Sequence, residues 1–96
     1  MPFETRVLDR VSSTYGLGVG DIDGDGLPDV AAGSIREPMI AWYRAPDWAR
    51  RVISTEHLGT IGVAPHDLDG DGRVEVALAS GFNQPATGYL HWMAPP

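Results

Sequence analysis

Short apolar stretches alternate with glycine-rich and acidic turns along the whole chain. The stretches are rich in valine, isoleucine, tyrosine and tryptophan, a composition typical of β-strands. Glycine and proline interrupt every longer window, which argues against a long helix. Strands are predicted in this way at residues 15–21, 29–34, 39–45, 50–54, 60–67, 75–80 and 89–94. The pattern therefore predicts an all-β chain.

The sequence contains an internal repeat with two copies. The stretch "GDIDGDGLPDV" begins at Gly20, and "HDLDGDGRVEV" begins 46 positions later at His66. Downstream, "IAWYRAP" (40–46) matches "YLHWMAP" (89–95) at an offset of 49, which aligns His91 with Trp42 and gives the second copy three extra residues. Repetition at this period indicates an architecture of stacked units.

Four short strands in about 46 residues is the size of one β-propeller blade. We therefore predict a single segment, residues 1–96, made of two blades with four-stranded antiparallel sheets. Blade one would span about 9–54 and blade two about 55–96. A small β-sandwich is the alternative, because its strand spacing is similar.

The two ends of the chain match parts of one blade. Residues 4–8, "ETRVL", resemble the fourth strand of a unit, whereas the second copy stops after its third strand. Propellers use four to eight blades. The chain is therefore expected to be a piece of a longer propeller or a unit whose copies associate head to tail. In either case residues 3–8 would form the outer strand of a preceding or neighbouring blade, and three or four copies would give six or eight blades.

Charge is concentrated in the repeated phrases. The net charge is −6, and eight of the thirteen acidic residues lie in these two phrases, as expected of cation sites. There is no cysteine, which excludes disulfides and thiol chemistry. No basic cluster indicates nucleic acid, no apolar run is long enough to span a membrane, and the first residues lack the apolar core of a signal peptide.

The spacing of the acids suits calcium, which takes six to eight oxygen ligands at about 2.3–2.6 Å. Each loop offers carboxylates at positions 1, 3, 5 and 9 and a backbone carbonyl at position 7. The predicted ligands of two Ca²⁺ ions are Asp21, Asp23, Asp25, Leu27 and Asp29, and Asp67, Asp69, Asp71, Arg73 and Glu75. An EF-hand would need a glutamate at position 12 and a following helix, but the sequence has Ala32 or Leu78 there and a strand. The alternative is an Asp-Gly hairpin turn that holds no metal.

Histidine and aromatic residues offer weaker candidates. His66 stands beside Asp67, but no Ser/His/Asp spacing indicates catalysis, so no catalytic residue is assigned. Trp42, Tyr43, Tyr89 and Trp92 could stack on sugars; their repeated placement favours packing within the blades.

The stretches "GVGDIDGDGLPDVAAGS" and "APHDLDGDGRVEVALAS" resemble the FG-GAP/VCBS class of β-propeller repeats. The resemblance implies calcium in each loop between the first two strands of a blade, although Glu75 replaces the usual aspartate. It also implies a secreted or cell-surface protein. We expect a calcium-stabilised module for binding or scaffolding, whose partners are further blades, copies of itself or a glycan. The alternative is a fragment of a propeller-type carbohydrate-active enzyme, such as a polysaccharide lyase or sugar dehydratase; fold alone decides neither.

Overall fold

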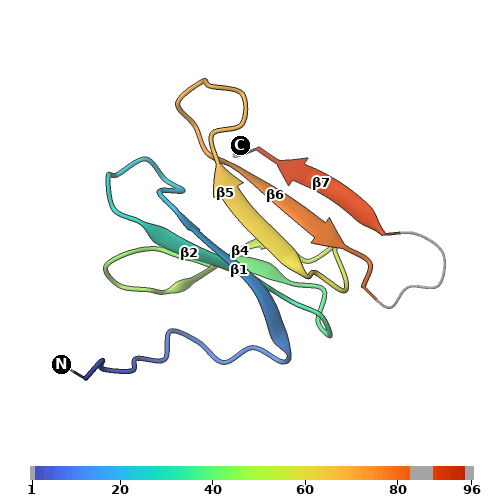
Figure 1. Cartoon of the computed structure of the whole chain (residues 1–96), viewed down its shortest axis with the longest axis horizontal. Helices are drawn as coiled ribbons and strands as arrows, with labels where there is room; N and C mark the ends of the chain where they lie inside the picture. The colour runs from blue at the N-terminus through green and yellow to red at the C-terminus, as the bar shows by residue number, and fades with distance from the viewer. Residues whose placement is uncertain (1, 83–87, 95–96) are drawn as a thin grey trace.

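The computed structural model describes residues 2–82 and 88–94, which contain seven β-strands in two antiparallel sheets and no helix (Figure 1). The prediction of an all-β chain is confirmed. In chain order the strands are β1 (Thr14–Gly20), β2 (Asp29–Ser34), β3 (Ile40–Tyr43), β4 (Arg50–Ser54), β5 (Gly62–His66), β6 (Glu75–Ser80) and β7 (Tyr89–Met93).

Each sheet is a meander in which strands that follow one another in the chain are neighbours. The first sheet has the order β1-β2-β3-β4 and the second has the order β5-β6-β7. Among the described residues the second sheet has no fourth strand, in agreement with the sequence. This arrangement fits two consecutive propeller blades, the second of which is incomplete.

The strand register corrects the alignment of the two repeats. Ala31 pairs with Trp42 in the first sheet, and Ala77 pairs with Trp92 in the second. Because Ala31 and Ala77 are 46 positions apart, Trp42 corresponds to Trp92 at an offset of 50, and the prediction that Trp42 matches His91 was wrong. The second copy thus has four extra residues rather than three, in a loop that lies partly outside the described residues. A one-residue slip matters because it moves every side chain of the strand to the other face.

The two sheets pack face to face through β1 and β5, which lie side by side in Figure 1. A Cβ added at Gly16 would lie 2.5 Å from the Ile61 carbonyl oxygen, and one at Gly18 would lie 2.4 Å from that of Val63. Only glycine therefore allows this close approach. Farther out, a hydrophobic cluster fills the junction: Ala31, Val63 and Val76 with Ile22, Trp42 and Ile53 around them.

The opposite side of the first sheet carries a second cluster, formed by Ala32, Met39, Ala41 and Tyr43, with Val11, Val30 and Trp48 packed against it. Asp9 fixes the segment before β1 to this side, because its carboxylate accepts hydrogen bonds from the Tyr43 hydroxyl at 2.8 Å and from Arg50 Nε at 2.5 Å. Residues 3–8 form no strand here, so their assignment to a neighbouring blade stays a prediction.

Candidate metal centre

Both acidic loops connect the first two strands of their sheet. The first follows β1 and ends where Asp29 opens β2, and the second follows β5 and ends where Glu75 opens β6. Gly26 and Gly72 have φ values of 88° and 89°, a conformation that a residue with a side chain rarely adopts. This turn wraps the chain around the carboxylates, as the sequence predicts, and the strand that follows each loop excludes an EF-hand.

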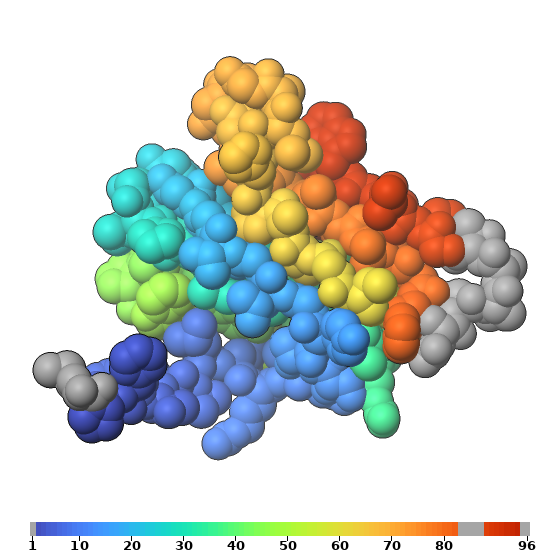
Figure 2. Space-filling view, viewed as in Figure 1, coloured from blue at the N-terminus to red at the C-terminus, as the bar shows by residue number. Residues whose placement is uncertain are grey.

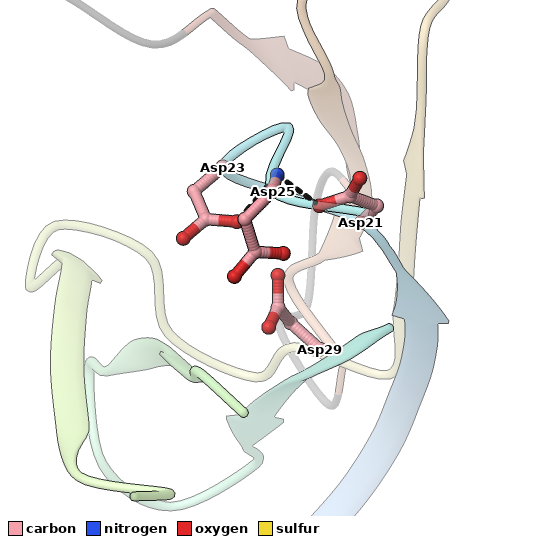
Figure 3. A group of neighbouring side chains, drawn as sticks. All are labelled: Asp21, Asp23, Asp25 and Asp29. Atoms are coloured by element: carbon pink, nitrogen blue, oxygen red, sulfur yellow. Dashed lines mark hydrogen bonds between the residues drawn. The ribbon is translucent and has the colours of Figure 1, made fainter. Parts of the chain in front are cut away.

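Four aspartates converge in the first loop (Figure 3). Asp21 accepts hydrogen bonds from the backbone amides of Gly24 at 2.9 Å and Gly26 at 2.8 Å, which holds its carboxylate inside the turn. Asp29 is fully buried and accepts from the amides of Ile22 at 2.9 Å and Ala45 at 3.0 Å. Backbone amides of the loop, together with the Ala45 amide beyond β3, therefore fix the first and the last carboxylate of the loop.

The second loop repeats this arrangement with a different residue at its last position. Asp67 accepts from the amides of Gly70 at 3.0 Å and Gly72 at 2.9 Å. Glu75 is 1% exposed and accepts from the Leu68 amide at 2.8 Å, the same bond that Asp29 makes with Ile22. The longer side chain of Glu75 thus occupies the place of Asp29.

The oxygen positions fit a calcium ion. In each loop one carboxylate oxygen from each of the four acids lies within 4.8 Å of the others. Two oxygens on opposite sides of one calcium ion are about 4.6–5.2 Å apart, twice the metal–oxygen distance, so four oxygens within this span can share an ion. The predicted side-chain ligands meet in two groups: Asp21, Asp23, Asp25 and Asp29; and Asp67, Asp69, Asp71 and Glu75. Ligation itself, including that by the Leu27 and Arg73 carbonyl oxygens, stays a prediction.

Electrostatics differ between the loops. In the first loop desolvation acts to raise the pKa of Asp23, but the hydrogen bond and charge of Arg44 together with the hydrogen bond from the Asp25 amide outweigh it, and the pKa is lowered. In the second loop the pKa of Asp69 is raised: the Asp71 amide acts to lower it, but desolvation and the Asp71 and Glu75 carboxylates prevail. The pKa of the neighbouring Asp71 is lowered, chiefly by the hydrogen bond from the Arg73 amide, so repulsion within the second loop shows at Asp69, where a divalent cation would relieve it.

Arg44 is the residue that reasoning from the sequence missed. Its guanidinium forms ion pairs with Asp23 and, at 3.4 Å, with Asp25. It lies just beyond β3, and at the corrected offset of 50 its counterpart in the second repeat is Ala94. Both offsets set an uncharged residue opposite Arg44, so the missing arginine was visible in the sequence; its contact with the first loop was not. Arg44 partly neutralises the first cluster and competes with a cation for two of its carboxylates.

The two loops also lie next to each other. Asp23 and Gly24 of the first loop and Gly72 and Arg73 of the second line a common hollow of about 230 Å³. An ion bound in one loop therefore changes the electrostatic field at the other. His66 is exposed at the end of β5 beside this region; a role for it stays a hypothesis.

Comparison with known protein families gives one match. Residues 21–78, which run from the first acidic loop through the second and into β6, match the FG-GAP-like repeat. No curated protein and no solved structure matched. Among the described residues no helix is long and apolar enough to cross a membrane. The match covers more than half of the sequence and includes both acidic loops, and the chain belongs to the FG-GAP-like repeat family.

Proposed function

We propose that this chain is a calcium-stabilised pair of propeller blades that serves binding or scaffolding. One blade would span about residues 9–54 and the other about 55–96, with residues 3–8 as the outer strand of a neighbouring blade. Two Ca²⁺ ions, one in each acidic loop, would fix the hairpins between the first two strands of the blades. The observation that carries the proposal is the convergence of four carboxylates in each of two equivalent loops.

The proposed role of calcium is structural. Asp29 and Glu75 are buried at the starts of β2 and β6, so an ion held by them would connect the loop to an inner strand of its sheet. Calcium bonds to the loop carboxylates would also offset their mutual repulsion, and with both ions bound the net charge of −6 would become −2. The predicted result is a rigid loop above each sheet.

Isothermal titration calorimetry with calcium chloride tests this proposal. The wild-type protein should bind two ions per chain, and Asp23→Ala and Asp69→Ala should each reduce this to one or weaken one site at least about tenfold, because each substitution removes one charged ligand. Asp47→Ala is the matched control, since Asp47 is an exposed acid in a different turn. Binding of two ions with unchanged affinity by both loop variants would show that these carboxylates are not the ligands.

The family membership also supports the partner and location that we propose. A module of stacked repeats buries its sheet faces against further repeats, so other blades are the expected partners. We place the protein in a secreted or cell-surface setting, where millimolar calcium would keep even weak sites of this kind filled. A calcium dissociation constant far above the millimolar range, measured by calorimetry, would count against a secreted or cell-surface setting.

A further inference from the structure

The contact between the two sheets defines two complementary surfaces. We call the side of each sheet that carries its tryptophan the tryptophan side and the other the valine side. Within the chain, the tryptophan side of the first sheet, with Ala31 and Trp42, packs on the valine side of the second, with Val63 and Val76. This contact joins two unlike surfaces, so one surface of each kind lies outside it.

The uncovered tryptophan side belongs to the second sheet. By the corrected register, Leu68, Leu90 and Trp92 correspond to Ile22, Ile40 and Trp42. Ile40 is fully buried, whereas Leu90 is 88% exposed; Trp92 is 59% exposed and Leu68 51%. Exposed apolar residues at positions that are used for packing in the other repeat mark an interaction surface.

The other valine side belongs to the first sheet; Val11 and Trp48 pack over part of it, at Ala32, Ala41 and Tyr43, whereas its positions on β1 are exposed. Leu17 and Val30 stand 46 positions before Val63 and Val76, the two valines that pack against Trp42. Leu17 is 63% exposed and its neighbour on the same side, Val19, is 60% exposed. One molecule therefore presents both kinds of surface that meet between its own sheets.

The second sheet, which carries the free tryptophan side, also has an unpaired strand edge among the described residues. Within the described residues nothing pairs with the outer edge of β7, and such an open edge is a template for strand addition. In the first sheet, β4 fills this position: Arg51 pairs with Trp42, and its guanidinium lies 5.4 Å from the centre of the indole ring. Residues 5–9, "TRVLD", match Arg50–Ser54, which places Arg6 opposite Trp92.

The segment that could pair with the β7 edge is exposed in the structure and far from it. Phe3 is 99% exposed and Val7 67%, and Arg6 forms a surface ion pair with Glu4. Figures 1 and 2 show the beginning of the chain along one end of the molecule and β7 at the opposite end. In this arrangement residues 4–8 do not reach the β7 edge of their own chain, whereas the same residues of a second copy can.

We propose that the tryptophan side and the β7 edge of one molecule bind a second copy of the chain head to tail. The second copy contributes its valine side, with Leu17 and Val30, and its residues 4–8 as the fourth strand, with Arg6 over Trp92. Ala64 and Ala79 stand where the first sheet has Gly18 and Gly33, so the docked sheet lies farther away than the two sheets within a chain. The proposal names the partner for the scaffolding function above, and its geometry does not depend on calcium.

Light scattering coupled to size exclusion tests the proposal with the full chain at about 1–500 µM in calcium. The wild type should form assemblies larger than a dimer that dissociate on dilution, because each added copy exposes the same pair of surfaces until a ring closes. Leu90→Asp and Leu17→Asp each disable one surface at an exposed position, so both variants should stay folded, as circular dichroism would confirm, and monomeric. Thr55→Asp adds the same charge at another exposed position and should associate as the wild type does.

Mixing the two variants gives the decisive result. Leu17→Asp keeps an intact tryptophan side and Leu90→Asp keeps an intact valine side, so an equimolar mixture should form a heterodimer that grows no further. Arg6→Ala should weaken wild-type association by about three- to tenfold through loss of the cation–π contact, whereas Arg10→Ala should not. A wild type that is monomeric throughout, or that stops at a dimer, overturns the proposal, as does a mixture that stays monomeric.

Repeating the mixture in chelator separates the two proposals. If the heterodimer forms in chelator and the calorimeter detects no calcium binding, the docking proposal stands and the metal assignment fails. If calcium binds to both loops but the mixture stays monomeric, the docking proposal fails and the metal assignment stands.

Discussion

Arg44 makes the two acidic loops chemically unequal at the scale of single residues. It pairs with Asp23 and Asp25 in the first loop, and its counterpart at the second loop is Ala94. A calcium ion entering the first loop must therefore displace a guanidinium from two prospective ligands. We expect the second loop to bind calcium more tightly than the first.

Replacing Arg44 should remove this difference. Arg44→Gln should raise the calcium affinity of the first loop by about three- to tenfold, the range expected when a partly exposed ion pair no longer competes. Titration calorimetry on an Asp69→Ala background would report the first loop alone. Arg36→Gln, an exposed arginine in the turn between β2 and β3, is the control and should leave the affinity unchanged. Weaker binding after Arg44→Gln would mean that Arg44 supports the ion rather than competing with it.

Asp9 predicts a pH dependence of stability. Hydrogen bonds from Arg50 and Tyr43 hold the pKa of Asp9 well below the usual range of an aspartate, and burial together with Asp9 raises the pKa of Tyr43 to about 12. A carboxylate with a lowered pKa stabilises the fold above its unfolded-state pKa, and this stability is lost as the pH falls through the folded-state value.

Asp9→Asn should therefore destabilise the protein near pH 6 by on the order of 1 kcal/mol, a modest value because Asp9 and Arg50 are partly exposed. The difference from the wild type should shrink as the pH falls below about 4, where Asp9 becomes protonated in the unfolded wild-type chain while the folded protein still holds it ionised. Urea unfolding of both proteins between pH 2.5 and 6 would measure this difference in stability. A difference that stays constant over this range would show that the charge of Asp9 does not carry the effect.

At the scale of elements, the close contact between β1 and β5 depends on glycine in one repeat and not in the other. A Cβ at Gly16 would approach the Ile61 carbonyl oxygen to 2.5 Å, whereas one at the equivalent Gly62 would meet only the Ala79 Cβ, at 3.8 Å. The same substitution in the two repeats therefore tests whether the sheets pack as described.

Gly16→Ala should destabilise the protein by about 1–3 kcal/mol, because β1 must move away from β5 to relieve the clash. Gly62→Ala should change stability by less than about 0.5 kcal/mol, since its contact is ordinary. Urea unfolding at a low micromolar protein concentration, which limits association, would measure both changes in stability. Equal effects of the two substitutions would contradict the packing of the sheets.

Composition and turn signals predicted most strands closely because turns rich in glycine, proline or aspartate separate most of them. "DVAAGS", "RRVIS" and "EVALAS" are β2, β4 and β6 from end to end. The alignment of "IAWYRAP" failed because offsets of 49 and 50 both match apolar and proline residues, and only interstrand hydrogen bonds decide between them. The residues before β1 carry strand-like composition but find no strand to pair with among the described residues.

Part of the candidate site was predictable because its residues lie close together in the sequence. The eight carboxylates come from two contiguous loops, so spacing alone placed them together. Arg44 approaches the first loop from β3, and a contact between elements cannot be read from spacing within one loop. The burial of Asp29 and Glu75 likewise depends on packing that only the folded sheets supply.

At the scale of the whole molecule, the concentrated negative charge predicts that either added salt or bound calcium stabilises the fold, because each reduces the repulsion among the carboxylates. In chelator, raising sodium chloride from about 10 to 500 mM should raise the melting temperature, because screening weakens repulsion among the exposed loop carboxylates. In calcium the same change of salt should have a smaller effect, since bound ions already offset that repulsion. Differential scanning calorimetry measures both series. Equal salt dependence with and without calcium would argue that no ion enters the loops.

The most direct test of the central claim is an anomalous difference map from a crystal of the wild-type protein grown in calcium. The account predicts one calcium peak in each acidic loop, within about 2.3–2.6 Å of oxygens from the four acids, with the glycine turns and strands unchanged. Two loops without a peak at full calcium concentration, while the hairpins keep their shape, would contradict it.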